Sequence, residues 1–493
     1  MRKLPIFYSA LLLTAVNLLL RTVGTSFQVF LSGRIGAGGM GLLQLVLSVG
    51  MLANTAAMAG IRTTAMYLTA EELGKNCPHN VSCVLSGCFT YSILCSGSIA
   101  LLLWFFSPTI AESWVGYGET AAAIRVLAAF LPVNCLCGVM SGYFTAAGRV
   151  GTLAAVEVAE QVCSIITTTC LLFFWAGADA TRACQAVVGG GGISACLTLG
   201  LLVFLRNKEH SQCCRSIPIA GRLLRLAVPL AGADVVKVGI NTLENLMVPK
   251  RLALFTGSAD PLGDFGRIGG MVFPILMFPA AILFGLCELL IPELARCNAA
   301  GSQRRIRYLA GRSLRIACVY GCACGGLMYL CADYLCDTLY RDSTAGVYLR
   351  MFAPLAPMLY CDNVTDAMTK GLGQQSTAVR YNILTAAMDV GLLFFLLPVM
   401  GIKGYFLSFL VTHLINFLLS LGLLRKITGP VWPASKAMFS LLGGVLAVVA
   451  ASLLPGWVGF SAFLPVFCAL LVLLRVVGTE DVRWIRGLLF KQT

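Results

Sequence analysis

The chain has 493 residues, of which 58% are hydrophobic and 12% charged, with 36 basic against 22 acidic side chains and a mean hydropathy of +0.84. A soluble globular domain carries roughly 25% charged residues, so this composition excludes an ordinary soluble protein and indicates that lipid is the main solvent. The basic excess also fits nucleic acid, but the positive residues stand in short loops between apolar segments, which is typical of a membrane protein. We therefore expect no nucleic-acid partner.

Long apolar segments recur along the whole chain. Each is about 20–28 residues long, which suits membrane helices and not the alternating strands of about 10 residues that build membrane barrels. We therefore expect an all-α integral membrane protein with about fourteen transmembrane helices. The expected helices cover residues 4–31, 39–66, 81–106, 121–147, 151–175, 183–205, 223–252, 268–294, 307–331, 346–371, 377–399, 402–424, 436–455 and 458–476. The first continues past Arg21 without a small-residue cleavage site, so we interpret it as a helix and not as a signal peptide.

The charge of the loops predicts the orientation of these helices. Loops on one side are basic and loops on the other are acidic or nearly uncharged, and basic loops stay in the cytoplasm. The basic loops contain Arg2, Lys3, Lys75, Arg149, Arg206, Lys208, Arg215, Arg222, Arg296, Arg304, Arg305, Arg425, Lys426, Arg483, Arg486 and Lys491, and the acidic loops contain Glu112, Glu119, Asp179, Asp260, Asp264, Asp337 and Asp342. Despite exceptions such as Arg34 and Lys403, we expect a protein of the cytoplasmic membrane with both termini inside.

The chain also repeats itself at an offset of 225 residues. The matched pairs are Arg125 with Arg350, Pro132 with Pro357, Gly148 with Gly373, Gly41 with Gly266 and Gly60 with Gly285. Six helices separate the copies, so both copies have the same orientation and a pseudo-twofold axis along the membrane normal is expected. The predicted organisation is a six-helix bundle at 1–205, a cytoplasmic linker at 206–222, a second bundle at 223–425, and helices thirteen and fourteen with a tail at 426–493. Two such bundles are typical of transporters that work by alternating access.

Three basic residues stand inside apolar segments. Charges in membrane helices are expensive and usually face a cavity or a partner. Arg21 and Lys237 lie near mid-depth in equivalent helices of the two halves, so we expect both to face a central cavity and bind substrate. The alternative is local pairing, for which Asp234 is the obvious partner of Lys237. Arg62 lies near the inner end of its helix, where it either joins the cavity, closes a cytoplasmic gate or extends its head to the interface.

Five acidic residues form a second set inside the same segments. They are Glu157, Glu160, Glu244, Glu288 and Asp389. They either bind a coupling cation or proton, or act in gating, or neutralise the basic residues. Asp366 and Lys370 are four residues apart on one helix, so we expect them to form a structural ion pair.

No set of residues predicts catalysis or a resident metal. The three histidines are His79, His210 and His413, and no nucleotide-binding fingerprint or Ser/His/Asp set is present. Two groups, Cys77 with His79 and Cys83 and His210 with Cys213 and Cys214, fit no standard zinc spacing. We therefore expect a protein that is not an enzyme and has no cofactor other than a coupling ion of unknown kind.

Several segments resemble a known family. The segment LLRTVGTSFQVFLSGRIGAGGMGLLQLVLSV at 19–49 resembles the first two helices of the polysaccharide-exporter branch of the multidrug/oligosaccharidyl-lipid/polysaccharide flippase superfamily. The segments at 222–252 and 266–296 are similar to the seventh and eighth helices of its stage V sporulation protein B family, which is related to the lipid II flippases. The resemblance implies a flippase for an undecaprenyl-pyrophosphate-linked saccharide, with a cationic cavity and two C-terminal helices that serve the lipid tail. Arg21 fits this pattern, whereas Glu288 and Glu293 depart from it.

The residues and the resemblance favour the same function. We expect a flippase for a peptidoglycan or polysaccharide precursor of the cell envelope, with sporulation as one setting, that acts as a monomer on an anionic lipid-linked saccharide in membrane lipid. A pyrophosphate lipid needs Arg or Lys in the cavity and no hydrolytic residues. A drug/cation antiporter of the same superfamily is the main alternative, but it favours an acidic residue in the first helix, which has none. A membrane-embedded glycosyltransferase or acyltransferase is disfavoured because every loop is short.

Overall fold

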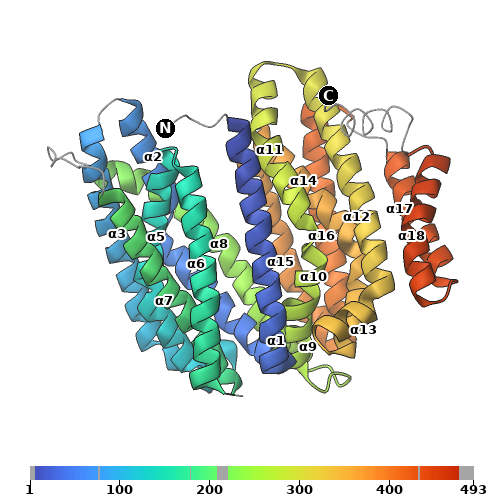
Figure 1. The fold of residues 1–493 in the computed structure, drawn as a ribbon, viewed down its shortest axis with the longest axis horizontal. Coiled ribbons are helices and arrows are strands. Elements are labelled where there is room, and N and C mark those ends of the chain that lie inside the picture. The colour runs from blue at the N-terminus through green and yellow to red at the C-terminus, as the bar shows by residue number, and fades with distance from the viewer. Residues whose placement is uncertain (1–5, 76–77, 178, 208–219, 431–433, 477–493) are drawn as a thin grey trace. The chain divides into compact units, whose positions relative to one another are not determined.

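The computed structural model describes residues 6–476 apart from 76–77, 178, 208–219 and 431–433, and every regular element in that part is helical (Figure 1). The α-helices are α1 (Ile6–Met58), α2 (Ile61–Gly74), α3 (Pro78–Phe105), α4 (Ser107–Thr109), α5 (Ala121–Ala146), α6 (Val150–Leu171), α7 (Ala180–Asn207), α8 (Ala220–Leu252), α9 (Pro261–Arg267), α10 (Phe273–Met277), α11 (Ala280–Ala299), α12 (Gln303–Leu339), α13 (Ser343–Phe352), α14 (Ala356–Gly371), α15 (Gln375–Met400), α16 (Ile402–Thr428), α17 (Ala434–Ser452) and α18 (Gly456–Leu473). Short π or 3₁₀ segments stand between some of them, namely η1 (Ile110–Val115), η2 (Gly118–Thr120), η3 (Leu172–Ala176), η4 (Ile268–Val272) and η5 (Ala353–Leu355).

Length and hydropathy agree with a membrane protein. In the described part of the chain, ten helical segments are long and apolar enough to cross a membrane, or eleven if the bent pair Pro261–Met277 and Ala280–Ala299 counts as one span. One of the ten, Leu18–Leu73, covers two of the expected helices. The expected helices at 223–252 and 346–371 are not among the ten, so the all-helical membrane architecture holds and the number fourteen stays a prediction.

Glycine separates the first helices. α1 bends at Gly36, whose φ of 69° and ψ of −178° are not helical, and this bend falls between the expected helices at 4–31 and 39–66. A second break, at Ala59 and Gly60 with φ of 42° and 70°, ends α1 and begins α2. The expected helix at 39–66 is therefore broken near its end, because positive φ is incompatible with a continuing right-handed helix.

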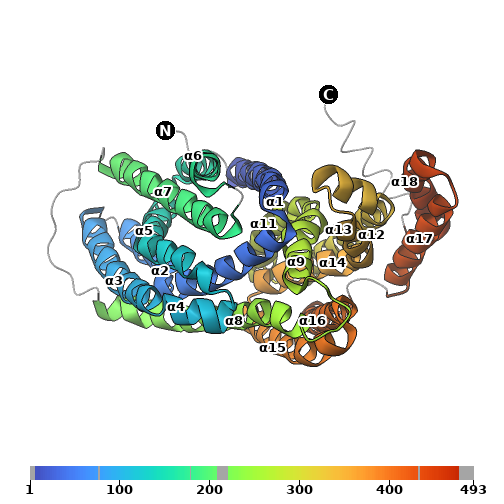
Figure 2. The same cartoon turned by 90° about the horizontal axis from the view of Figure 1, so that it is seen from below.

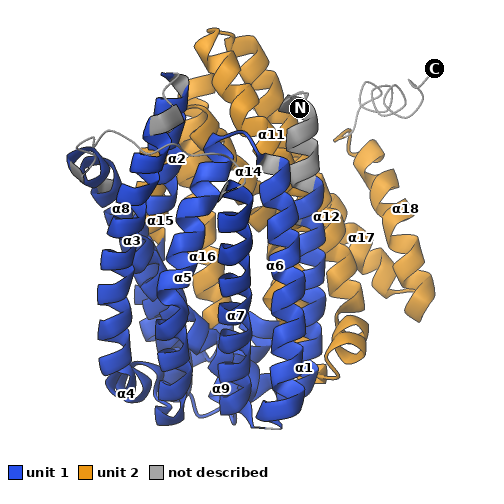
Figure 3. Ribbon diagram, turned by 60° about the vertical axis from the view of Figure 1, so that its left-hand side comes forward, with its two compact units in different colours: residues 1–270, 386–404 blue, residues 271–385, 405–493 orange. Residues whose placement is uncertain are grey.

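Two compact units make up the chain, and Figure 3 shows them in two colours. Unit 1 comprises residues 1–270 and 386–404. Within it α5 packs against α7, α3 and α2, while α6 packs on α7, as the end-on view in Figure 2 also shows. α1 contacts α3, α5, α6 and α7, and it also packs against α8 and α9.

The sequence repeat assigns α8 and α9 to the second bundle, but both helices lie in unit 1. Thr242 of α8 donates to the carbonyl of Ser48 in α1 at 3.1 Å, and the Asn245 amide donates to the Ser48 hydroxyl at 3.0 Å. Gly266 of α9 lies so close to α1 that a Cβ there would be 2.0 Å from the Ala37 carbonyl oxygen. These contacts place α8 and α9 in unit 1, so the six-plus-six bundles expected at 1–205 and 223–425 remain a proposal about symmetry.

Unit 2 comprises residues 271–385 and 405–493. α12 packs against α13, α14 and α17, α11 packs on α14, and α17 pairs with α18. The contact of α18 with α12 depends on a glycine, because a Cβ on Gly326 would lie 2.2 Å from the ring of Phe463. The outer faces of α17 and α18 carry exposed apolar side chains, including Val445 at 61% and Leu473 at 76%, as expected for helices in contact with lipid.

Candidate functional site

A polar cavity of about 580 Å³ lies inside unit 1. Its polar lining comes from α1, α5 and α8 and consists of Gln44, Ser48, Asn54, Asn134 and Asn245. Backbone of α7 at Gly191 and Gly192 completes one wall. The lining contains amides and a hydroxyl but no charged side chain, and the buried Oδ1 of Asn54 accepts no hydrogen bond from the described residues.

Arg62 interacts electrostatically with Glu157, and the pair joins α2 to α6 inside unit 1. α2 comes this close to α5 because Gly142 of α5 lacks a side chain, and a Cβ there would lie 2.5 Å from the Arg62 carbonyl oxygen. Gly138 of α5 likewise admits Met58 at the end of α1, from which a Cβ would lie 2.8 Å. The structure thus gives Arg62 an acidic partner within unit 1, whereas the sequence offered a cavity, a gate or the interface as its surroundings.

Glu160 stands one turn beyond Glu157 on the same helix, and the two carboxylates repel each other. The backbone carbonyl of Glu160 accepts a hydrogen bond from the Ser194 hydroxyl of α7 at 2.7 Å. Both acidic residues therefore line the α6 side of unit 1, where Arg62 is the cation that acts on Glu157.

The two cations expected at the centre have different surroundings. Arg21, in the first part of α1, is partly exposed and takes part in a polar or electrostatic interaction. Lys237 of α8 is exposed, and so is Asp234 one turn before it. A meeting of Arg21 and Lys237 at one ligand stays a prediction.

Two of the five acidic residues come together. The carboxyl of Glu244 on α8 lies within hydrogen-bonding reach of the carboxyl of Asp389 on α15, and Asp389 is buried. Two carboxylates side by side repel each other, so a close pair needs a proton or a bound cation between them. The sequence placed these residues in two distant helices and gave no sign that they meet.

Glu288 lies apart from that pair, in unit 2. It is exposed on α11, next to Cys287, which also senses the charges of Asp366 and Lys370 on α14. The expected ion pair between Asp366 and Lys370 is confirmed at 2.6 Å. Glu293 is bound to Arg305 at 2.6 Å across the loop before α12, so its departure from the family pattern has a local structural role.

An ion-pair cluster joins the end of α2 to the start of α8. Arg222 binds Glu71 at 2.5 Å and approaches Glu72 at 3.6 Å, while Lys75 binds Glu71 at 2.6 Å. Asn80 donates to Glu72 at 3.0 Å. The hydrogen bond to Glu71 raises the pKa of Lys75 above its ordinary value, so the cluster keeps its charges at neutral pH.

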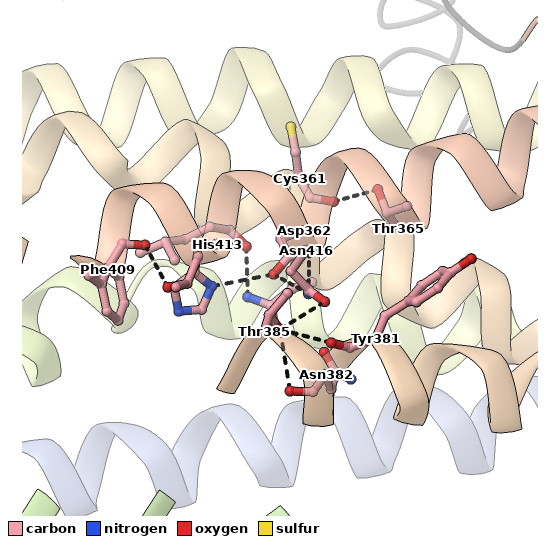
Figure 4. Close-up of polar contacts among 12 residues, drawn as sticks. Cys361, Asp362, Thr365, Tyr381, Asn382, Thr385, Phe409, His413 and Asn416 are labelled. Atoms are coloured by element: carbon pink, nitrogen blue, oxygen red, sulfur yellow. Dashed lines mark hydrogen bonds and ion pairs between the residues drawn. The ribbon is translucent and has the colours of Figure 1, made fainter. Parts of the chain in front are cut away.

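A buried network in unit 2 was missed by sequence reasoning (Figure 4). The Asn416 amide of α16 donates to both carboxylate oxygens of Asp362 on α14, at 3.0 and 3.1 Å. His413 Nδ1 lies 3.5 Å from Asp362 Oδ2, and Thr385 of α15 lies 3.5 Å from the Asn416 Oδ1. The signal was available, because Ser408, Thr412, Asn416 and Ser420 recur every four residues along an otherwise apolar helix and all four are buried.

No group of three or more His, Cys, Asp or Glu that could hold a metal ion occurs in the described part of the chain. Of the two groups considered from sequence, Cys77 and the group at 210–214 lie outside the described residues.

Part of the chain resembles a known family of membrane proteins. The MatE family model matches residues 14–170. The chain is also similar to stage V sporulation protein B of Bacillus subtilis (strain 168), with 22% identity over 98% of both chains.

Two solved structures have the same fold. The lipid II flippase MurJ in an inward closed conformation gives a TM-score of 0.71 at 12% identity, and the match covers 96% of this chain and 99% of that one. An inward-facing multidrug resistance MATE family transporter of the MOP superfamily gives 0.70 at 14% identity, covering 84% of this chain and 98% of that one. The chain therefore shares its fold with these two membrane proteins.

Proposed function

We propose that this chain is a flippase that moves an undecaprenyl-pyrophosphate-linked saccharide, a peptidoglycan or polysaccharide precursor, across the cytoplasmic membrane by alternating access. The observation that carries the proposal is the cavity of unit 1, which offers amides and a hydroxyl and no carboxylate. Saccharide hydroxyls need such donors and acceptors, whereas an organic cation would favour an acidic lining. The cavity is lined by helices of the first half of the repeat and by α8 of the second, as a site between repeats requires.

The pyrophosphate is assigned to Arg21 and Lys237. A charged side chain at the centre of a membrane helix costs roughly 2.5–3.5 kcal/mol on insertion scales, so an exposed lysine such as Lys237 is retained for a use. Arginine binds phosphate oxygens in a bidentate manner, while lysine acts as a point charge. In this scheme Arg21 orients the pyrophosphate, Lys237 neutralises it, and Arg62 stays with Glu157.

The C-terminal pair of helices is assigned to the lipid tail. The flippase structure covers 96% of the chain and the multidrug transporter 84%, a difference of 12% of 493 residues, or about 59 residues. That length is close to the 67 residues that follow Lys426. The exposed apolar faces of α17 and α18 fit a polyprenyl chain. Loss of transport after deletion beyond Lys426 supports this assignment, and full transport excludes a required role.

Two contacts support the pseudo-twofold repeat. Gly41 and Gly266, which are matched at the 225-residue offset, lie against each other, since a Cβ on Gly266 would be 2.5 Å from the Gly41 nitrogen. Matched arginines also make matched contacts: Arg125 donates to Ser107 at 2.9 Å and Arg350 binds Asp333, 18 and 17 residues earlier. Two residues that are equivalent in the repeat touch each other only near the symmetry axis, so this contact fits an axis that passes between α1 and α9.

Coupling is assigned to Glu244 and Asp389. A proton or a small cation between the two carboxyls would relieve their repulsion, and its release would change how α8 and the end of α15 pack. The orientation with both termini in the cytoplasm and a monomeric state complete the proposal. Reporter fusions that place Asp179 and Asp337 outside would support that orientation.

The decisive experiment is reconstitution of the full chain in bacterial phospholipid vesicles containing a fluorescent undecaprenyl-pyrophosphate disaccharide. Inside-to-outside transfer is read with a membrane-impermeant quencher. We expect Arg21→Ala to abolish transfer, Arg21→Lys to impair it and Lys237→Arg to be mild, with unchanged gel-filtration profiles. Full transfer by Arg21→Ala would exclude the assigned role. The same vesicles test the antiporter alternative: uptake of an organic cation driven by a proton or sodium gradient, with no lipid transfer, would favour it.

A further inference from the structure

One face of α8 borders a second cavity of unit 1, of about 480 Å³, which we call the α8 groove. Its residues recur at helical spacing from Gly239 through Leu243 to Lys250, and α1, η1 and α15 supply the other walls. Along α8 the groove covers 11 residues at 1.5 Å per residue, or roughly 17 Å. That length is close to the hydrocarbon depth of one leaflet, roughly 15 Å, so the groove can hold one acyl chain.

The body of the groove is suited to hydrocarbon. Two hydroxyl groups border it, and both are already engaged: Thr242 donates to the Ser48 carbonyl at 3.1 Å, and Ser113 donates to the Thr109 carbonyl. The remaining wall along α8 is apolar and open, as Leu243 shows with 55% exposure. A polar ligand would find few partners there, whereas an acyl chain would lose contact with no hydrogen-bonding group.

Two cations stand together at one end of the groove. The Lys250 ammonium reaches across to η1 and donates to the Ser113 carbonyl at 2.5 Å. The Arg251 guanidinium lies over the Phe394 ring of α15, 3.3 Å from its centroid. The two charged heads therefore rest on different walls of the same opening. In the described part of the chain no carboxylate lies within ion-pair distance of either head.

Both cations keep hydrogen-bond donors for a ligand. An ammonium has three donors, and Lys250 uses one of them on Ser113. The Phe394 ring covers the face of the Arg251 guanidinium, which leaves the donors at its edge for in-plane contact with phosphate oxygens. The helix dipole favours cations in this last turn of α8, but it does not require side chains that cross to η1 and α15.

The acidic residues of the neighbouring segments are directed elsewhere. Asp260 and Asp264 both pair with Arg267, at 3.9 and 3.1 Å. The Glu112 side chain lies against Gly118, where a Cβ would be 3.5 Å from its Cγ. The end of the groove therefore has a positive charge that these carboxylates do not neutralise.

Trp114 separates the α8 groove from a second apolar groove. The second groove has a volume of about 400 Å³, lies between α1 and α3, and shares Leu52 and Trp114 with the first. Tryptophan is enriched at the level of the lipid headgroups, and Trp114 directly follows the Ser113 that Lys250 contacts. Two apolar grooves on either side of an interfacial tryptophan, with two cations beside it, match the two chains and the phosphate of a phospholipid.

We propose that unit 1 binds one anionic diacyl phospholipid at this place, with its phosphate between Lys250 and Arg251. One acyl chain lies along α8 and the other lies in the groove between α1 and α3. A zwitterionic headgroup also carries phosphate, but its ammonium opposes the two cations, so the site selects a net negative lipid. The lipid is a resident partner of unit 1, and its binding does not depend on which substrate the chain carries.

The test is lipid binding to the purified full-length protein, read by native mass spectrometry. Phosphatidylglycerol and phosphatidylcholine with the same acyl chains are compared. We expect phosphatidylglycerol to bind roughly tenfold more tightly, since each basic residue near the headgroup favours an anionic lipid. Lys250→Gln with Arg251→Gln should abolish this preference. Arg425→Gln with Lys426→Gln, which removes two adjacent cations from the last turn of α16, is the matched control and should retain it.

A steric variant tests the groove without changing charge. Gly239→Leu places a side chain in the groove, and its Cβ would meet Leu52 at 3.8 Å, an ordinary contact, so the fold should be retained. It should weaken phosphatidylglycerol binding, whereas Gly232→Leu, which has nothing within 4 Å on the same helix, should not.

Three results would overturn the proposal. They are equal binding of the two lipids, a preference that survives loss of both Lys250 and Arg251, and equal effects of the two glycine variants. Glycerophosphoglycerol, the headgroup without its chains, should compete poorly, and competition equal to that of the intact lipid would exclude a role for the grooves. The measurement reads binding of a phospholipid and not transfer, so its failure and the failure of the proposed flippase activity are distinguishable.

Discussion

Both units bury amide and hydroxyl side chains among apolar helices, but they use them in opposite ways. In unit 1 the amides of Asn54, Asn134 and Asn245 surround about 580 Å³ of open volume, and one oxygen of Asn54 has no partner among the described residues. In unit 2 the Asn416 amide closes on Asp362 at 3.0 and 3.1 Å. Amides that line open volume can meet a ligand, whereas an amide that closes on a buried carboxylate stabilises helix packing.

The difference has a packing origin. Glycines of α7 form one wall of the unit 1 cavity, and the Phe130 ring lies where a side chain on Gly192 would be, since a Cβ there would lie 2.2 Å from it. In unit 2 the rings of Phe352 and Tyr405 pack against Phe409, on the helix that carries Asn416. The comparison predicts that the same kind of substitution will affect stability in one unit and transport in the other.

The largest effect is expected from Asn416→Leu in unit 2. It removes the donor to a buried carboxylate, and breaking a hydrogen bond to a charged group costs about 1.5–3 kcal/mol. We expect the free energy of unfolding to fall by about 3 kcal/mol, measured by thermal unfolding of the purified protein in detergent. Wild-type stability in this variant would contradict the view that the network holds α14 and α16 together. Thr428→Val, at the end of the same helix, is a control that removes a local hydrogen bond only.

A steric test of unit 1 comes next. Gly266→Ala places a Cβ 2.0 Å from the Ala37 carbonyl oxygen, so α9 must move away from α1. Overpacking of this kind costs typically about 1–3 kcal/mol, and we expect about 2 kcal/mol in thermal unfolding. Gly269→Ala is the matched control, since its nearest neighbour would be Gln44 at 3.7 Å. Equal stability of the two variants would argue against a close α1–α9 crossing.

Removing a polar group from the unit 1 cavity should affect transport and leave stability intact. Asn134→Leu replaces a cavity-lining amide by an apolar side chain of similar size, and no buried charge depends on it. We expect lipid transfer in vesicles to fall by about tenfold, which corresponds to about 1.4 kcal/mol, with unfolding unchanged. If the variant instead loses stability and retains transfer, the contrast between the units is wrong.

The smallest effect is expected at the ion-pair cluster between α2 and α8. Arg222 and Glu71 are 41% and 30% exposed, and exposed ion pairs contribute about 0–1 kcal/mol. Arg222→Gln should therefore lower stability by less than about 1 kcal/mol, and the difference should vanish in high salt. A larger loss that persists in high salt would indicate a closed, water-excluded contact.

Part of the site was readable from the chain and part was not. The Asp366–Lys370 pair follows from helical spacing alone, because residues four apart share a face. The buried stripe of Ser408, Thr412 and Asn416 has the same spacing and could have been found. The pairs Glu244–Asp389 and Arg62–Glu157 could not, because each joins two helices that are far apart in the chain.

The sequence by itself determined that this protein is helical and membrane-embedded, since a charged fraction of 12% and apolar segments of helical length leave no other way to satisfy the backbone in lipid. It also marked the glycine matches at 225 residues. Only the tertiary structure decided that Gly41 and Gly266 touch, that α8 packs with the first helices, and that Asp362 faces His413. The reason is physical: helix formation depends on neighbours along the chain, whereas which helix faces meet depends on side-chain fit between segments hundreds of residues apart.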